Sequence, residues 1–190
     1  MHRHLDDAAL AFGAEFNRFS HPTLVTGSRL HVVPSISYPL MTPGGYVIPR
    51  LAWQATTYQL QNNAAGSPDA FTRALPVMSI DSGLTFERPI SYSGQSYTQT
   101  LEPRVFYLRA PAREQSGIPI FDTGLADFNF AQIFSENIYS GTDRIADANQ
   151  LTTAVTTRLL GQKDGRERLR FTLGQRFYFT EQRVTLPGEI

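Results

Sequence analysis

Residues 96–111, SYTQTLEPRVFYLRAP, alternate between apolar and polar side chains along most of their length. One parity carries aromatic and aliphatic residues: Tyr97, Leu101, Val105 and Tyr107. The other parity carries polar and charged residues: Ser96, Thr98, Thr100, Glu102 and Arg104. Since successive side chains of a β-strand point to opposite faces, this stretch predicts a strand with one apolar and one charged face.

Six further segments alternate in a similar way, and together the seven predict an all-β chain with antiparallel strands. They occupy residues 7–19, 29–40, 45–59, 74–87, 149–160 and 168–179. Four of the seven segments contain an interior proline, which removes a backbone donor and predicts a bulge or a strand end: Pro34, Pro49, Pro76 and Pro103.

The surroundings of the apolar face distinguish two folds. A soluble β-sandwich binding module would bury Tyr97 and Leu101 between sheets, whereas a transmembrane β-barrel would turn them to lipid and point Glu102 and Arg104 into a wet lumen. Tyr97 and Tyr107 are ten residues apart, which is roughly 33 Å along a strand. A tilt of about 40° projects this to roughly 25 Å, the height of the apolar band of an outer-membrane barrel. The spacing of these two aromatic residues favours a strand whose apolar face contacts lipid over one buried in a soluble sandwich.

Composition narrows the class of protein. The 190 residues carry 17 basic and 17 acidic side chains, and this zero net charge gives no support to nucleic-acid binding. Cysteine is absent, which excludes a disulfide or a thiolate metal site within these residues. The sequence has no run of about 18 apolar residues, so a transmembrane helix is excluded. Seven strands cannot close a membrane barrel by themselves, and the sequence therefore predicts part of a much larger barrel.

Residues 110–147 form one long connection, far above the roughly 2 to 5 residues of a hairpin loop. Within it, residues 122–134 predict a short helix that begins at a cap residue, Asp122 or Thr123. Its aromatic side chains either fold the loop inward as a lid on the lumen or pack the loop against itself: Phe128, Phe130, Phe134 and Tyr139.

Several uncommon motifs follow one another between residues 99 and 159. They are TLEPR, YL followed by P-x-R-x-Q-S, FDT, F-x-E-N-x-Y-S-G-x-D-R-I, and DANQLT. In this order they closely resemble the barrel domain of the LptD family of outer-membrane lipopolysaccharide-assembly proteins. Residues 49–60, 79–88 and 167–179 are similar to the same family, so the resemblance covers nearly the whole chain.

The resemblance implies a barrel of about two dozen strands in the outer membrane of a Gram-negative bacterium. It implies lipopolysaccharide as cargo, a lipoprotein plug, LptE, in the lumen, and a periplasmic bridge that delivers the lipid through a domain absent from these residues. The connection at 110–147 would then be extracellular. Residues 1–190 are therefore interpreted as an internal part of the barrel domain, without the family's first and last barrel strands.

Charged side chains on the polar face of the predicted strands form a candidate luminal polar wall: Asp81, Glu87, Glu102, Arg104, Arg170 and Arg176. Such a wall would contact a phosphorylated, sugar-bearing head group or the plug; alternatively, its charges only pair across neighbouring strands. Turn-capping side chains are candidates for loop architecture: Asp122, Asp143, Arg144, Asp147 and Asn149. A lipid or divalent-ion contact by their carboxylates is the alternative.

Histidines give little support to a metal site or to catalysis. His2 and His4 form an H-x-H motif that is more typical of a chain end than of a metal site. His31 and Ser35 share a strand face and suggest an outer-membrane hydrolase, but residues four apart on a strand are about 13 Å apart and cannot act as a pair. The lipid export that the resemblance implies needs no covalent chemistry, so no catalytic, cofactor or metal residues are predicted.

Overall fold

The computed structural model describes residues 8–64 and 66–188, which form a single antiparallel β-sheet. Their alternating side chains fit a strand, which sends successive residues to opposite faces. The prediction of an all-β chain is confirmed. The strands are β1 (Ala9–Phe19), β2 (Thr26–Ser37), β3 (Leu40–Thr42), β4 (Gly45–Gln61), β5 (Ala70–Leu84), β6 (Phe86–Tyr92), β7 (Gln95–Ala110), β8 (Ala148–Gly161) and β9 (Glu167–Tyr178).

Seven strands define the sheet order β1-β2-β4-β5-β7-β8-β9, and the two short strands β3 and β6 pair with β4 and β7. β3 continues β2 without a change of register, because Ser37 faces Arg50 and Leu40 faces Val47. β6 likewise continues β5 along β7. The seven predicted segments therefore correspond to seven positions in the sheet, two of them interrupted. Pro39, which has no N–H to donate, lies at the first interruption.

The interior prolines do not act as predicted. Pro34, Pro49, Pro76 and Pro103 all lie inside strands, and the pairing register is the same before and after each of them. The register shift recorded in the described ladders lies instead between Leu159 and Leu160, where β8 pairs with β9. The expectation of bulges or strand ends at the four prolines is wrong.

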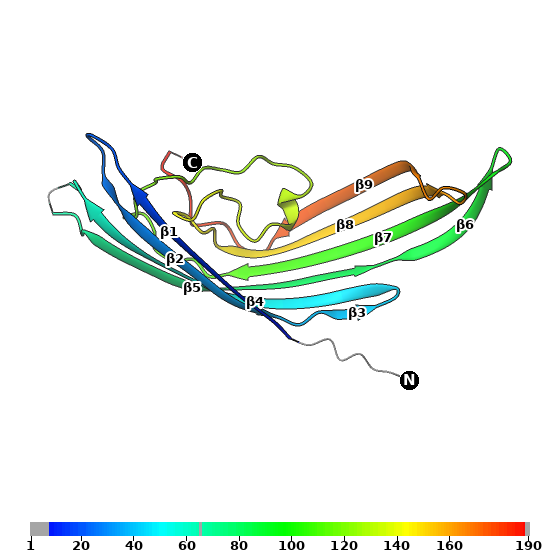
Figure 1. Ribbon diagram of the computed structural model, residues 1–190, viewed down its shortest axis with the longest axis horizontal. Helices are drawn as coiled ribbons and strands as arrows, with labels where there is room; N and C mark the ends of the chain where they lie inside the picture. Colours follow the sequence, from blue (N-terminus) through cyan, green and yellow to red (C-terminus); the bar gives the residue numbers. More distant parts are fainter. Residues whose placement is uncertain (1–7, 65, 189–190) are drawn as a thin grey trace.

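The sheet is strongly curved and is not closed, with β1 and β9 as its end strands (Figure 1). Residues 111–147, here called the connection, join β7 to β8 and lie over the concave side of the sheet together with the C-terminal segment 179–188 (Figure 1). The connection starts at residue 111 rather than 110, because Ala110 still pairs with Ala148.

Apolar packing holds the connection against the sheet. A buried cluster joins inner-face side chains of β4, β5, β7 and β8 to the connection: Ala52, Leu75, Val77, Phe106, Leu108, Ala110, Ile145 and Ala148. Val184 of the C-terminal segment packs with Tyr139 and Ala146 of the connection in a second cluster. The core thus lies between the concave face and its own connection, since burial of these apolar side chains favours a docked segment.

The helix expected to begin at Asp122 or Thr123 is not formed. The connection contains one turn of 3-10 helix, η1 (Gln132–Phe134), which follows Ala131. Asp122 and Thr123 do not cap it, because their side chains are bonded to Arg29 and Asp143. None of the helices in residues 8–64 and 66–188 has the length and hydropathy of a membrane span.

Candidate functional site: the concave face

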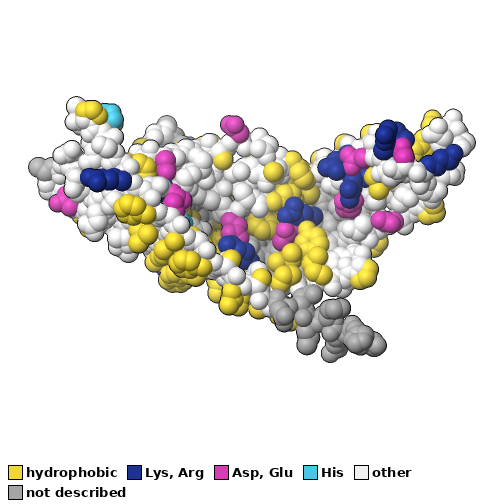
Figure 2. All heavy atoms as spheres, viewed as in Figure 1, with side chains coloured by type: hydrophobic (Ala, Val, Ile, Leu, Met, Phe, Trp, Pro, Cys, Tyr) yellow, Lys and Arg dark blue, Asp and Glu magenta, His cyan; other side chains and the backbone are white. Residues whose placement is uncertain are grey.

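The two faces of the sheet differ in chemistry. The outer face exposes large apolar side chains from every long strand, among them Phe12, Leu30, Leu51, Trp53, Met78, Leu101, Val155, Phe171 and Phe177. In Figure 2, yellow side chains gather along the lower edge of the view, on the side away from the connection. Leu101 is 48% exposed and Phe177 is 43% exposed, so neither is sealed between protein layers.

The six residues of the predicted polar wall share the opposite, concave face. Directly paired residues lie on one face of a sheet. Through its paired residues, each of the six lies on the same face as the even-numbered residues of β7. The pairs are Asp81 with Phe106, Glu87 with Thr100, Glu102 with Thr156, Arg104 with Ala154, Arg170 with Arg158, and Arg176 with Thr152. The structure brings them to one face but not into one cluster.

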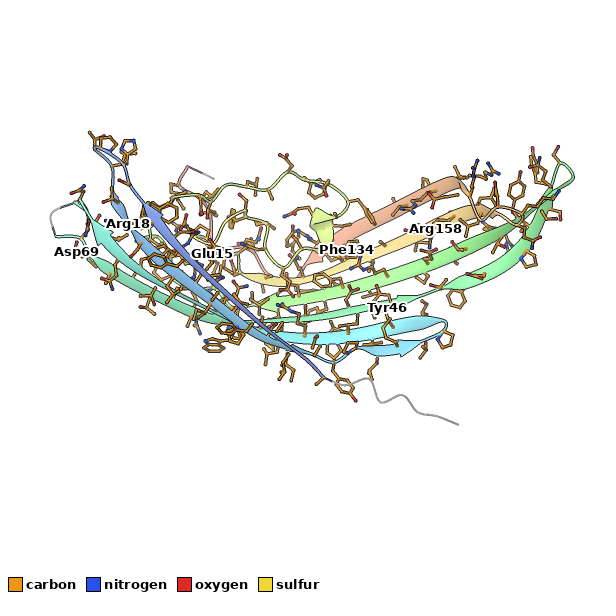
Figure 3. The ribbon with its side chains drawn as sticks, viewed as in Figure 1. Glu15, Arg18, Tyr46, Asp69, Phe134 and Arg158 are labelled. Carbon is orange, nitrogen blue, oxygen red and sulfur yellow. The ribbon has the colours of Figure 1, made fainter. Side chains whose placement is uncertain are left out.

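Three of the wall residues form two ion pairs between neighbouring strands. Arg104 of β7 donates to both carboxylate oxygens of Asp81 of β5, at 2.9 and 2.6 Å, and Tyr46 of β4 donates to the same carboxylate at 3.2 Å. Arg158 of β8 donates from Nε to Glu102 of β7 at 2.7 Å. Phe134 of η1 packs on the Arg104 guanidinium, with its ring centroid 4.0 Å from Cζ. Figure 3 shows Phe134 at this turn above the sheet.

The other three wall residues have local partners or open surroundings. Arg176 donates to the backbone oxygen of Gln132 in η1 at 2.7 Å, which ties β9 to the connection. Arg170 pairs with Glu167 on the same strand at 2.8 Å. Glu87 is exposed. The six wall residues therefore share one face but differ in their contacts.

A buried cluster around Asp143 holds the connection to β2 and β4. The Asp143 carboxylate accepts from Arg29 at 2.7 Å and Tyr58 at 3.1 Å. It also accepts from the backbone N–H groups of Phe121 and Asp122, at 2.8 and 3.0 Å. Arg29 is 1% exposed and Asp143 is fully buried. We call Arg29, Tyr58, Asp122 and Asp143 the Asp143 cluster.

Arg29 and Arg73 extend this anchoring across the sheet. Arg29 donates to both oxygens of Asp122 at 2.7 Å, so one guanidinium bridges two carboxylates of the connection. Arg73 of β5 donates to Gln115 at 2.7 Å and to the backbone oxygen of Asp143 at 2.8 Å. Buried charges require such partners, because an unpaired buried charge costs several kcal/mol.

The charge state of Asp143 follows from these contacts. Burial by itself would raise the pKa of this carboxyl. The hydrogen bonds from the backbone of Asp122 and Phe121 and the charge of Arg29 outweigh burial, and the pKa of Asp143 lies below its ordinary value. Asp143 is therefore an anion at neutral pH and has hydrogen-bond donors at both oxygens.

The five predicted loop residues have structural partners. Asp122 and Asp143 belong to the Asp143 cluster, and Asp147 accepts from the backbone N–H groups of Arg183 and Val184 at 2.9 Å each. Asn149 lies in β8 rather than in the loop, and it accepts from the Tyr107 hydroxyl at 3.0 Å. Arg144 is buried and donates to the backbone oxygen of Asp143 at 3.1 Å.

The structure gives no support to a His31–Ser35 pair. The Nδ1 atom of His31 lies 2.8 Å from the Thr56 hydroxyl, so its partner comes from β4. His2 and His4 lie outside the described residues. Within residues 8–64 and 66–188 no group of three or more His, Asp or Glu side chains is arranged to hold a metal ion.

Sequence reasoning missed Arg29, Tyr58 and Arg73, whose side chains bond to the connection. It also missed Gln115 of the connection and Arg158, which pairs with Glu102. The first three lie on the inner parity of their strands, which is the signal that could have found them. Periodicity assigns a residue to a face, but it does not indicate which distant segment covers that face. The hydrogen bonds of Arg29 and Arg73 to Asp122, Thr142 and Asp143 span 69 to 114 positions of the chain.

These observations define a class of protein: a large, open antiparallel sheet with an apolar outer face and a polar inner face filled by its own connection. The family model for LPS transport system D, LptD, matches residues 2–189. The chain therefore belongs to the LptD family, as its motifs predicted.

Curated relatives carry the same family name. The chain is 52% identical over 175 residues to the LPS-assembly protein LptD of Thiobacillus denitrificans, covering 92% of this chain and 24% of the relative. It is 51% identical over 180 residues to the LPS-assembly protein LptD of Aromatoleum aromaticum, covering 94% of this chain and 23% of the relative. The chain thus spans about a quarter of the length of the relatives it matches.

Proposed function

We propose that this chain is an internal part of an outer-membrane β-barrel that assembles lipopolysaccharide into the outer leaflet of a Gram-negative bacterium. The two relatives described above are both named LPS-assembly protein LptD, which supports a role in lipopolysaccharide assembly. The concave face would line the lumen, and the connection would be an extracellular loop folded into it. Transport of this kind makes and breaks no covalent bond, so it requires no catalytic residue.

The single observation that carries the proposal is the exposed apolar outer face. A water-soluble sandwich would cover Leu101, Trp53 and Phe171, yet each is about half exposed or more. A lipid bilayer covers such a face without a second protein layer. β4, β5, β7 and β8 have 17, 15, 16 and 14 residues, longer than the roughly 9 to 11 that cross a membrane.

The open edges of β1 and β9 support a larger barrel. Backbone N–H and C=O groups at a free sheet edge have no partner in hydrocarbon, and each unpaired group costs several kcal/mol. Further strands of a longer chain would pair with both edges. The polar wall would then face the passing head group or a luminal plug of the LptE type. The periplasmic bridge would deliver lipid from the periplasmic side of the membrane.

Replacement in a full-length relative tests the proposal. The matching quarter of the Thiobacillus denitrificans relative is replaced by this chain, and the chimera is expressed as the only copy in cells whose growth depends on the relative. Lipopolysaccharide is then measured at the cell surface by labelling of intact cells. The expected result is growth with surface lipopolysaccharide close to that of cells with the unchanged relative.

Heat-modifiable mobility on a gel and membrane fractionation report whether the chimera forms a barrel. A chimera that folds in the outer membrane and leaves lipopolysaccharide inside the cell would contradict the proposal. A chimera that works no better than its variant with the outer-face residues Leu101 and Val155 both replaced by Asp would also contradict it.

A further inference from the structure

A pocket of about 280 Å³ opens where the start of the connection, its end and the C-terminal segment meet. Three of its lining residues are arginines, Arg113, Arg144 and Arg183, and Glu114 is its acidic residue. The pocket therefore has an excess of positive charge, although the chain as a whole is neutral.

Arg144 is the unusual member of this pocket. It is only 2% exposed, yet its guanidinium makes a single hydrogen bond, from Nη1 to the backbone oxygen of Asp143 at 3.1 Å. A guanidinium carries five N–H donors, so four of them have no acceptor among residues 8–64 and 66–188. The pocket is the open space that this side chain lines, and a ligand there would supply the missing acceptors.

The arginines of the pocket differ from those of the sheet. Arg29, Arg104 and Arg158 each pair with a carboxylate. In the described part of the chain, Arg113, Arg144 and Arg183 have no carboxylate within ion-pair distance. Burial lowers the pKa of Arg144 and outweighs the attraction of Asp143, as expected for a buried cation without a close counter-ion.

Glu114 does not neutralise the pocket. It is exposed, and its carboxylate accepts the backbone N–H of Ser116 at 2.7 Å. The hydrogen bonds from Ser116 hold the pKa of Glu114 below its ordinary value. The Glu114 carboxylate is not within ion-pair distance of Arg144, so the pocket keeps a net positive charge.

We propose that this pocket binds a phosphate group, held by the Arg144 guanidinium and closed by Arg113 and Arg183. Arginine suits this role because its planar fork matches phosphate oxygens in a bidentate arrangement. The volume lies just below the roughly 300–1,000 Å³ of small-molecule sites, enough for a phosphate with part of the group that carries it. That the phosphate belongs to a glycolipid head group rests on the proposed function; binding of free phosphate needs only the pocket.

Calorimetric titration with inorganic phosphate tests the site. The protein is the chimera described above, which contains the full chain, purified in detergent at fixed ionic strength. The expected result is saturable binding that weakens at least tenfold in Arg144→Gln, while Arg144→Lys keeps part of the affinity. Arg166→Gln, an exposed arginine in the turn between β8 and β9, is the matched control and should bind as the unchanged chimera does.

A second variant avoids the risk that loss of a buried arginine prevents folding. Arg113 and Arg183 are exposed, so Arg113→Gln with Arg183→Gln should fold and should also lower the affinity at least tenfold. Absence of phosphate binding, or equal affinity in the chimera and this double variant, would overturn the proposal.

Vesicles distinguish the two sources of phosphate. Vesicles that contain a diphosphorylated glucosamine-disaccharide lipid should displace inorganic phosphate, and vesicles with the dephosphorylated lipid should not. Phosphate binding with no displacement by either vesicle supports the pocket and overturns the lipid occupant. The surface-lipopolysaccharide measurement is independent of this titration, so failure of the pocket and failure of the proposed function give different results.

Discussion

Arg29 and Asp143 lie 114 positions apart in the chain, yet Nη1 of the arginine donates to Oδ1 of the aspartate at 2.7 Å in the buried interior. This contact fastens the end of the connection to β2, three strand positions away from β7, where the connection begins. A loop of this length has many alternative conformations, and the charge pair selects one in which it fills the concave face. The inner wall is thus built partly from the connection itself.

Asp143→Asn should release this part of the connection. The substitution keeps the shape of the side chain but removes the charge that Arg29 and two backbone N–H groups require, and breaking a buried pair typically costs about 3–5 kcal/mol. Arg29 retains Asp122, so the loss should fall at the low end of that range. Limited trypsin digestion should then cleave at Arg113 or Arg144 at least tenfold faster than in the unchanged chain.

Asp127→Asn is the matched control for this experiment. Asp127 lies in the same connection, undergoes the same chemical change and is exposed. Its cleavage rate should stay within about twofold of the unchanged chain, as for most surface substitutions. Equal rates in the two variants would mean that the Asp143 cluster does not hold the connection.

The Asp143 cluster should also weaken in acid. The pKa of Asp143 is lower in the folded chain than its ordinary value, so its contribution is complete above the unfolded pKa, about 3.9. The contribution is lost as the pH falls through the lower folded pKa. Hydrogen-exchange protection factors at the backbone N–H groups of Phe121 and Asp122 should be constant from pH 8 to 5 and fall below about pH 4.

Three variants test whether protonation of Asp143 causes the fall in hydrogen-exchange protection at low pH. Arg29, Tyr58 and Asp122 face the Asp143 carboxylate, and Arg73 and Arg144 lie close to it. Asp143→Asn should remove most of the pH dependence and lower protection between pH 5 and 8, where Asp143 of the unchanged chain is ionised. Asp122→Asn tests the contribution of the neighbouring carboxylate, and Asp127→Asn should leave the profile unchanged. A profile that persists in Asp143→Asn would refute the assignment.

Trp53 provides a direct test of the outer face. It is the single tryptophan of the chain and is 48% exposed on that face. In lipid vesicles its emission should shift to shorter wavelength, and lipids with brominated acyl chains should quench it, because the side chain would contact hydrocarbon. Aqueous iodide should have little effect. A Trp53→Phe, Asp127→Trp variant moves the probe to the connection and should reverse the two quenching results.

The strand pattern was predictable because a two-residue period is a local property of the chain. Tyr97, Leu101 and Val105 fall on one face and Glu102 and Arg104 on the other, as expected from their spacing alone. The same reasoning placed all six wall residues on one face. It did not anticipate that Phe106 and Leu108, on the polar parity, are buried, because the segment that covers them follows later in the chain.

The helix prediction failed for a related reason. Asp122 and Thr123 are good helix caps in isolation, and local propensity alone favours a helix there. In the folded chain Arg29 of β2 and Asp143 compete for the same side chains and provide stronger, charged partners. Contacts between residues far apart in the chain thus outweigh a local preference that a single sequence reveals.

Gly27 should tolerate no side chain, in contrast to Gly13. A Cβ at Gly27 would overlap the backbone oxygen of Gln59 and lie 3.1 Å from Cα of Leu60, so β2 and β4 would have to separate locally. A Cβ at Gly13 meets nothing nearer than 4.0 Å. Gly27→Ala should therefore lower the free energy of unfolding by about 1–3 kcal/mol, as overpacking does.

Gly13→Ala is the control, since alanine restricts the unfolded chain and should stabilise by about 0.4–1 kcal/mol where it fits. Urea unfolding in lipid vesicles, followed by Trp53 fluorescence, measures both variants. The two midpoints should move in opposite directions. A Gly27→Ala midpoint equal to or above that of the unchanged chain would show that β2 and β4 do not approach as closely as their pairing at Gly27 and Leu60 requires.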